Sequence, residues 1–146
     1  MNFKIIKARE EHRKDISRLL RTTRIGSFGK HERIKNFWVV KMNDRIVACA
    51  GLDFFDKEIA IFTHLAVEKE FRHQGIGSAL IRLRMDKAKK RGAKILAFVT
   101  MYYWFRFYKK RGFRTCPRKN LSENIKNYWM FTAKRYMKCA VMYQYM

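Results

Sequence analysis

The sequence predicts a mixed α/β fold, with a mainly antiparallel sheet of about six or seven strands flanked by helices. In the first half of the chain, strand-like segments follow one another with short turns between them, which is typical of antiparallel hairpins. In the second half, amphipathic segments alternate with strand-like ones, which is typical of helices that cross over a sheet. The length of 146 residues, of which 48% are hydrophobic, indicates a single domain over residues 1–146 with a substantial core.

One helix and four strands are predicted in the first half. Apolar and basic residues alternate at residues 3–7, which is the period of a strand. Residues 10–24 place apolar side chains at helical spacing, with acidic residues in the first turn and basic residues in the last, as the helix dipole favours. Asn43-Asp44 reads as a tight turn between two apolar segments. The predicted elements are helix 10–24, a glycine-containing break at 25–29, and strands 3–7, 37–41, 45–52 and 59–67.

The second half begins with a predicted helix at residues 77–91. Its apolar face carries Ile81, Met85 and Ala88, and Gly92 follows as a stop signal. Residues 94–100 form an apolar run of the kind that is buried on both faces of a sheet. The remaining predicted elements are a helix at 103–110, an irregular and partly helical excursion at 117–137, and a last strand at 139–145.

The chain is strongly basic, with 34 Lys and Arg against 12 Asp and Glu and a formal net charge of +22. Residues 101–146 are the most one-sided part, because 11 basic residues stand there against Glu123 alone. Such a field attracts polyanions, so it indicates nucleic acid, an acidic substrate or a phosphate-rich cofactor without choosing between them. Basic and aromatic residues interleave between Arg106 and Lys138, which suits nucleic acid. A solvated basic face over core aromatics explains them as well, and we favour that interpretation.

Nothing in the sequence indicates export or a membrane. No run approaches 18 uncharged apolar residues, and the first residues read as a strand rather than as the apolar core of a signal peptide. Cys49, Cys116 and Cys139 are odd in number and share no spacing typical of a metal or redox site. We therefore expect a cytoplasmic protein with reduced thiols and no metal.

The most informative segment is a glycine-containing turn between the strand that ends at Val67 and the helix that follows. The first turn of a helix exposes N–H groups that lack an internal partner, and the helix dipole adds positive charge there. The missing side chains of Gly75 and Gly77 let a phosphate approach that backbone, and Arg72 can add a charged contact. Taken alone, two such glycines are more often an ordinary turn and helix start. The third glycine of a dinucleotide fingerprint and the Gly-Lys-Ser/Thr of a P-loop are both missing.

This turn belongs to a longer pattern. Leu65-Ala66-Val67 precedes Arg72-x-x-Gly75-x-Gly77. A predicted helix and an apolar strand follow, and after them the chain reads Phe107-Tyr108-Lys109-Lys110-Arg111-Gly112-Phe113. In order and spacing, from Lys4 to the last strand, the chain resembles the GNAT superfamily of acetyl-CoA-dependent N-acetyltransferases. Within that superfamily, the stretch from Ile95 through Gly112-Phe113 and Pro117 to the cysteine-containing end is faintly similar to amino-acid N-acetyltransferases.

The resemblance implies acetyl-CoA as cosubstrate and a sheet splayed at its central strands. The pantetheine arm would pair with the backbone of the strand before the turn, here Leu65, Ala66 and Val67. Arg72 would lie at the rim, and the amides that hold the pyrophosphate would be those of His73, Gln74, Gly75, Ile76, Gly77 and Ser78. The family often has an asparagine where this chain has Met101, so one cofactor contact departs from the pattern.

The chemistry implied by the resemblance needs three contributions. The acceptor amine must lose a proton, and His64 and Glu58 are the first candidates for the base, with Asp53 and Asp56 nearby in sequence and a chain of water molecules as the alternative. A backbone donor such as the Val67 N–H would stabilise the oxyanion. Tyr108, at the position of the family's tyrosine, would protonate the departing thiolate. A hydrogen-bonded core histidine, a solvated Glu58 and a core Tyr108 are the competing interpretations.

The predicted function is transfer of an acetyl group from acetyl-CoA to a primary amine of an amino acid, a peptide, or a protein N-terminus or lysine, by direct attack in a ternary complex. The positive field favours a carboxylate-bearing acceptor, such as an amino acid, a peptide or a protein N-terminus, over a polyamine. Two alternatives stay open: a basic RNA- or ribosome-associated module of the same fold, and an acetyltransferase that acts on an RNA-bound amine such as aminoacyl-tRNA. The oligomeric state is also open, with a dimer as one candidate.

Overall fold

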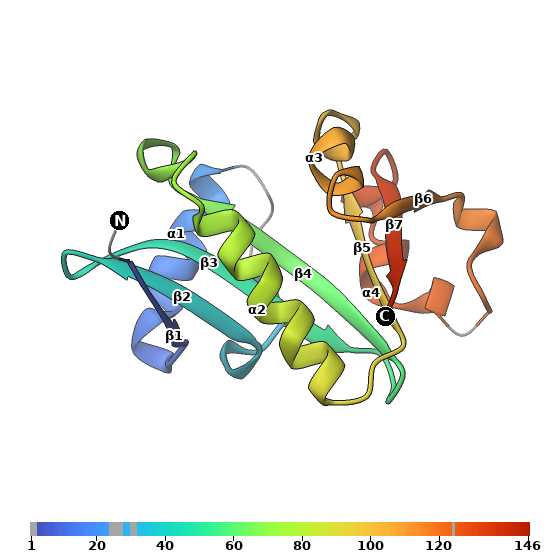
Figure 1. Cartoon of the computed structure of the whole chain (residues 1–146), viewed down its shortest axis with the longest axis horizontal. Coiled ribbons are helices and arrows are strands. Elements are labelled where there is room, and N and C mark those ends of the chain that lie inside the picture. The colour runs from blue at the N-terminus through green and yellow to red at the C-terminus, as the bar shows by residue number, and fades with distance from the viewer. Residues whose placement is uncertain (1–2, 24–27, 30–31, 124) are drawn as a thin grey trace. The chain divides into compact units, whose positions relative to one another are not determined.

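The computed structural model describes residues 3–23, 28–29, 32–123 and 125–146. It confirms the mixed α/β fold, with a seven-stranded sheet in the order β1-β2-β3-β4-β5-β7-β6 (Figure 1). The strands are β1 (Lys4–Lys7), β2 (Phe37–Met42), β3 (Arg45–Phe54), β4 (Ile59–Val67), β5 (Ile95–Thr100), β6 (Arg114–Cys116) and β7 (Ala140–Tyr145). The chain divides into two compact units. The first unit comprises residues 1–53 and 62–87, and the second comprises residues 54–61 and 88–146.

The first unit contains the predicted hairpin. Strands β1 and β2 pair antiparallel, with Ile5 opposite Val40, and β2 pairs antiparallel with β3. The turn between β2 and β3 places Asn43 and Asp44 at φ values of 49° and 62°, the left-handed conformation that both central residues of a type I′ turn require. Asn and Asp tolerate this conformation better than other non-glycine residues, which is why the dipeptide predicted the turn correctly.

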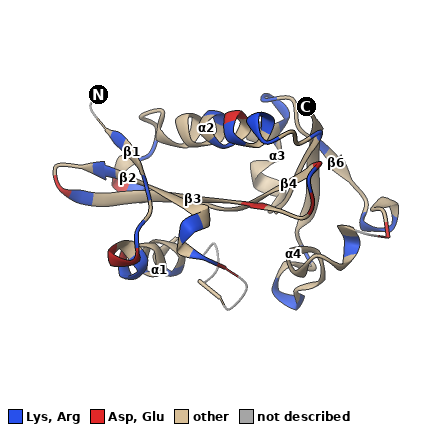
Figure 2. Ribbon diagram, turned by 90° about the horizontal axis from the view of Figure 1, so that it is seen from below, with Lys and Arg blue, Asp and Glu red and all other residues tan. Residues whose placement is uncertain are grey.

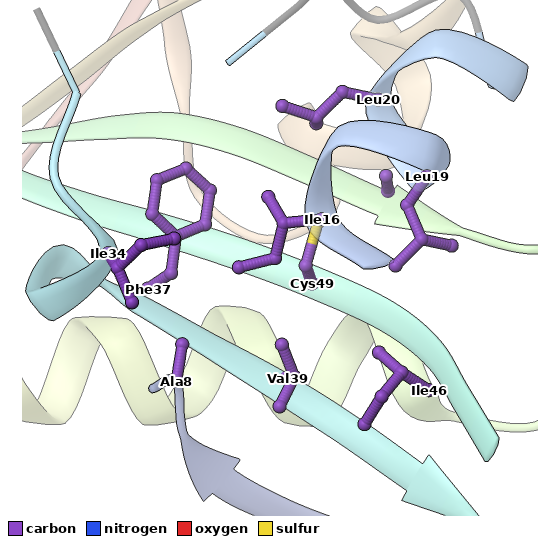
Figure 3. Packing of buried hydrophobic residues seen from close by; sticks show 10 residues of the cluster. Ala8, Ile16, Leu19, Leu20, Ile34, Phe37, Val39, Ile46 and Cys49 are labelled. Carbon is purple, nitrogen blue, oxygen red and sulfur yellow. The ribbon is translucent and has the colours of Figure 1, made fainter. Parts of the chain in front are cut away.

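Helix α1 (Arg13–Thr22) packs the core of the first unit, and a 3₁₀ turn at Glu10–His12 precedes it. Its residues Ile16, Leu19 and Leu20 are fully buried and belong to one hydrophobic cluster with Val39 of β2 and Cys49 of β3 (Figure 3). Burying each such aliphatic side chain contributes about 1.5–3 kcal/mol relative to leaving it exposed. The structure thus confirms the predicted helix up to Thr22, whereas residue 24 and most of the break expected at 25–29 lie outside the described residues.

Helix α2 (Ile76–Lys90) follows β4, and its part in the first unit lies on the face of the strands opposite α1 (Figure 2). The helix begins one residue before the predicted start. Leu80, Ile81, Arg84 and Ala88 are buried along it. The expected apolar face is therefore confirmed at Ile81 and Ala88, while Met85 is half-buried and an arginine occupies the buried stripe.

The second unit is built on β5 and β7. The first residues of β4 pair parallel with β5 over Ile59–Ile61 and Ile95–Ala97, and β7 pairs antiparallel with both β5 and β6. The sequence did not predict β6, because three residues are too short to show an alternating pattern. Residues 117–137 are irregular, as predicted, with helix α4 (Trp129–Thr132) between 3₁₀ turns.

The helix predicted at 103–110 is shorter than expected. A 3₁₀ turn covers Tyr102–Trp104, and helix α3 covers Phe105–Lys109.

Among the described residues, none of the helices combines the length and the hydrophobicity that a transmembrane segment requires.

Candidate active site

The segment between β4 and α2 forms the predicted turn. Ala79 N–H donates to Gly75 O at 3.0 Å, which is the first i to i−4 hydrogen bond of α2. The amides of Ile76 and Gly77 precede that bond, so helix geometry gives them no acceptor within the helix. His73 and Gly75 have φ values of 63° and 86°. Left-handed residues within such a turn can direct successive N–H groups toward one point, which makes an anion-binding concavity.

The space beside the turn is open. Apart from its chain neighbours and the adjoining helix backbone, a Cβ atom built on Gly75 or Gly77 meets no heavy atom of the described residues within 4 Å. The Arg72 side chain donates from Nε to Val67 O at 3.0 Å, which holds its guanidinium near the end of β4. Open space, first-turn amides and a guanidinium together can bind a phosphate group.

Glu68 fixes the segment that enters the turn. Its backbone N–H donates to Val47 O at 2.9 Å, and its buried carboxylate forms ion pairs with Arg18 and, at 2.7 Å, with Arg45. A buried carboxylate is stable only when charged or hydrogen-bonding partners compensate its lost hydration, and the two arginines supply that compensation. The turn therefore starts from a backbone position that is tied to β3.

Arg84 of α2 lies at the centre of the first unit and is fully buried. Its Nη1 donates to Gly51 O of β3 at 2.9 Å and to His64 O of β4 at 3.0 Å. Its guanidinium also stacks on the Phe62 ring, 3.8 Å from the ring centroid. The side chain thus joins α2 to two adjacent strands. Sequence reasoning missed this role, although the spacing Leu80-Arg84-Ala88 placed Arg84 on the buried stripe.

His64 is buried in β4, and its ring nitrogen Nε2 lies 2.6 Å from Glu32 Oε1. Both side chains are almost inaccessible, with 2% and 3% exposure. The imidazole also stacks on Phe37 at a centroid distance of 6.1 Å. The Glu32 carboxylate thus lies directly against one ring nitrogen of the imidazole. No sequence signal could have identified Glu32, which is 32 positions away in a segment without regular periodicity.

Glu58 belongs to the second unit, at the turn before β4. Its carboxylate lies 3.2 Å from Lys94 Nζ in an exposed ion pair, and its carbonyl accepts the N–H groups of Lys94 and Ile95. Asp56 Oδ1 accepts the N–H groups of Glu58 and Ile59 at 2.8 and 2.9 Å. These contacts place Glu58 and Asp56 at the start of the β4–β5 pairing.

Tyr108 lies on α3 in the second unit and is buried, with 9% exposure. Its ring packs against Phe98 and Phe113 at centroid distances of 4.6 and 5.9 Å. Met101, in place of the family's asparagine, contacts Cys139 Sγ through its sulfur at 3.4 Å. Tyr108 is thus part of the aromatic core of this unit.

The three cysteines are free thiols. Burial raises the pKa of Cys49 to about 12, and burial also raises the pKa of Cys116 and of Cys139. A thiol with a raised pKa is a poor nucleophile at neutral pH, because the thiolate is the reactive form. Within the described part of the chain, no group of three or more His, Cys, Asp or Glu residues could hold a metal ion.

Solved structures share this fold over nearly the whole chain. The N-acetylglutamate synthase of Neisseria gonorrhoeae, complexed with coenzyme A and N-acetyl-glutamate, superposes with a TM-score of 0.84 and 18% identity, covering 99% of this chain and 35% of that one. Naa50 of Arabidopsis thaliana, complexed with the bisubstrate analogue CoA-Ac-MVNAL, superposes with a TM-score of 0.77 and 17% identity and covers both chains fully. At these identities the likeness concerns the fold.

Sequence relatives point to the same group. An uncharacterized N-acetyltransferase of Chlorobaculum tepidum is 24% identical over 94 residues, which are 64% of this chain and 59% of that protein. An amino-acid acetyltransferase of Pseudomonas aeruginosa is 36% identical over 84 residues, which are 56% of this chain and 19% of that protein. The chain thus spans about three-fifths of the length of the first relative and about one-fifth of the length of the second.

The family profile of the GNAT acetyltransferase domain matches residues 33–115, more than half of the chain. This range contains β4, the glycine turn, α2, β5 and α3, which are the elements on which the sequence resemblance was based. The chain therefore belongs to the GNAT acetyltransferase family.

Proposed function

We propose that the protein transfers an acetyl group from acetyl-CoA to a primary amine. The observation that carries this proposal is the open turn between β4 and α2, where first-turn amides, Gly75 and Gly77 offer an anion-binding backbone. The diphosphate of coenzyme A is an anion of the size that such a turn accepts. Structural neighbours of this chain were solved with coenzyme A, which supports the choice of ligand.

In this proposal the turn amides from His73 to Ser78 bind the diphosphate, and Arg72 contributes its Nη groups. Leu65, Ala66 and Val67 offer strand backbone to the pantetheine arm. The parallel β4–β5 pairing supports this role, because its register covers Ile59–Ile61 whereas β4 continues to Val67. Bound acetyl-CoA supplies the activated acetyl group.

His64 accepts the proton of the acceptor amine in the proposed reaction, and Glu32 orients its imidazole. The Val67 N–H donates to the oxyanion of the attacked carbonyl, and Tyr108 gives its phenolic proton to the leaving thiolate. The raised pKa values of the cysteines support direct attack by the amine, because an acyl-cysteine intermediate requires an activated thiolate.

The acceptor we propose is a carboxylate-bearing amine, such as an amino acid or a peptide N-terminus. The formal charge of +22 favours such a substrate over a polycation. The amino-acid acetyltransferase among the relatives and the N-acetyl-glutamate bound in a structural neighbour point to the same class.

The test is a screen for acetyl-CoA-dependent thiol release with amino acids, peptides and spermidine as acceptors. We expect release to depend on the acceptor and to be fastest with a carboxylate-bearing amine. A protein that binds coenzyme A but releases thiol at the same slow rate with every acceptor would contradict transferase activity.

Substituting Tyr108→Phe is expected to lower kcat at least about 100-fold and to leave acetyl-CoA affinity nearly intact, because only the proton donor is removed. Steady-state kinetics and titration calorimetry measure the two quantities. Tyr103→Phe, the same change at an exposed tyrosine, is the matched control and should leave kcat unaltered. Unchanged turnover in Tyr108→Phe would remove the tyrosine from the mechanism.

Substituting His64→Gln is expected to lower kcat at least about 100-fold, the usual contribution of a general base. Glu32→Gln should lower kcat less and leave KM for acetyl-CoA unchanged, because Glu32 acts through the imidazole. Thermal melting reports whether each variant is folded. Wild-type turnover in a folded His64→Gln variant would show that water removes the proton and that the His64–Glu32 pair is structural.

A further inference from the structure

The aromatic run that begins α3 is only partly core. Tyr102, Tyr103 and Trp104 are 75%, 62% and 43% exposed. Six large hydrophobic side chains are exposed among the described residues, and four of them are the consecutive residues Met101–Trp104. Grouped exposure of this kind marks an interaction surface, because isolated exposed apolar residues are common but contiguous patches are not. Tyr108 of the same aromatic run is buried, whereas these three residues are exposed.

The exposed rings support one another. Tyr102 and Tyr103 pack edge to face at a centroid distance of 5.7 Å, and Tyr103 packs against Trp104 at 5.8 Å. Trp104 in turn rests on Phe107 at 5.9 Å. Side chains held in this way lose little further rotational freedom when a ligand stacks on them, so their contribution to binding is larger.

Cations surround the same rings. A surface hollow of about 590 Å³ is lined by Tyr102, Tyr103, Phe105, Arg106, Lys109 and Lys110. Arg106, Lys109 and Lys110 are exposed, and within the described residues no ion pair neutralises them. Exposed aromatic faces beside uncompensated cations match a ligand that presents both flat rings and phosphates.

We propose that this aromatic–basic surface, formed by Tyr102, Tyr103, Trp104, Arg106, Lys109 and Lys110, binds single-stranded RNA. Bases stack on the three exposed rings, and phosphates contact the three cations. A double helix does not fit this chemistry, because its bases are already stacked. RNA is favoured over DNA because the Tyr102 and Tyr103 hydroxyls can exchange hydrogen bonds with ribose 2′-hydroxyls. The assignment does not depend on transferase activity.

Fluorescence anisotropy with a labelled 12-nucleotide RNA tests the proposal. The triple variant Tyr102→Ala, Tyr103→Ala, Trp104→Ala should bind at least about 100-fold more weakly, because each of the three stacked bases contributes at least about 1 kcal/mol. The variant Arg106→Gln, Lys109→Gln, Lys110→Gln should bind more weakly and reduce the slope of log affinity against log salt by about 2. Circular dichroism and melting check that both variants are folded.

The variant Lys87→Gln, Lys89→Gln, Lys90→Gln on α2 is the matched control, because it removes the same charge from another exposed position. We expect it to bind RNA at least about 10-fold more tightly than the variant Arg106→Gln, Lys109→Gln, Lys110→Gln at 150 mM salt. Equal losses in the two variants would overturn the proposal in favour of a general electrostatic field. Equal affinity for a duplex or for DNA of the same sequence would also overturn it.

Coenzyme A provides the remaining arm of the test. At 1 mM it should leave RNA binding unchanged. Complete displacement of the RNA would show that the aromatic–basic surface holds the nucleotide end of the acetyl donor, which overturns the RNA assignment and leaves the proposed acetyl transfer intact.

Discussion

Replacing Gly77 by valine is expected to weaken acetyl-CoA binding at least about 100-fold while the protein stays folded. The valine side chain would occupy the open space beside the first-turn amides of α2. A diphosphate that cannot reach those amides loses at least two charge-assisted hydrogen bonds, each contributing about 1.5–3 kcal/mol. Two of them amount to about 3 kcal/mol, or about 100-fold in the dissociation constant measured by titration calorimetry. Folding should not suffer, because valine is no worse than glycine inside a helix.

Gly92→Ala is the matched control at the other end of α2. Gly92 has a φ of 89°, so an alanine there costs about 1–2 kcal/mol of stability without approaching the turn. Its acetyl-CoA affinity should stay within about two-fold of the wild type. Tight binding by Gly77→Val would show that the diphosphate lies elsewhere, and the proposed function would lose the observation that carries it.

Replacing Arg84 by methionine is expected to lower the free energy of unfolding by about 3 kcal/mol and the melting temperature by about 10 °C. The substitution leaves the buried carbonyls of Gly51 and His64 without their guanidinium donor. It also removes the desolvation cost of a buried cation, which acts in the opposite direction. We expect the loss of these hydrogen bonds to outweigh the removed desolvation cost, because carbonyl oxygens and the Phe62 ring already compensate the guanidinium.

Arg82→Met is the control for this prediction, because Arg82 is exposed on the same helix. Its effect on the free energy of unfolding should stay within about 0.5 kcal/mol. Chemical denaturation measures both variants. An Arg84→Met variant as stable as the wild type would mean that the desolvation cost of Arg84 equals the stabilisation from its hydrogen bonds. Arg84 would then not hold α2 to the sheet.

The elements that the sequence predicted best are those encoded by local patterns. Strand β4 has the predicted bounds, 59–67, because seven of its nine residues are apolar and turns flank it. The turn at Asn43-Asp44 followed from residue types that tolerate a left-handed backbone. Strand β6 was missed because its pairing with β7, between Arg114 and Tyr143 for example, is set by a distant segment rather than by its own composition.

The sequence by itself determined the glycine turn, since a strand, two glycines and a helix in succession fix which backbone amides lack partners. Only the tertiary structure placed Glu32 against His64, buried Arg84 of α2 against β3 and β4, and left Tyr102–Trp104 exposed. The physical reason is the separation along the sequence between the residues that interact. Periodicity and turn chemistry report what neighbouring residues do to one backbone, whereas the partner of a charge and the burial of a ring depend on segments that meet only when the chain has folded.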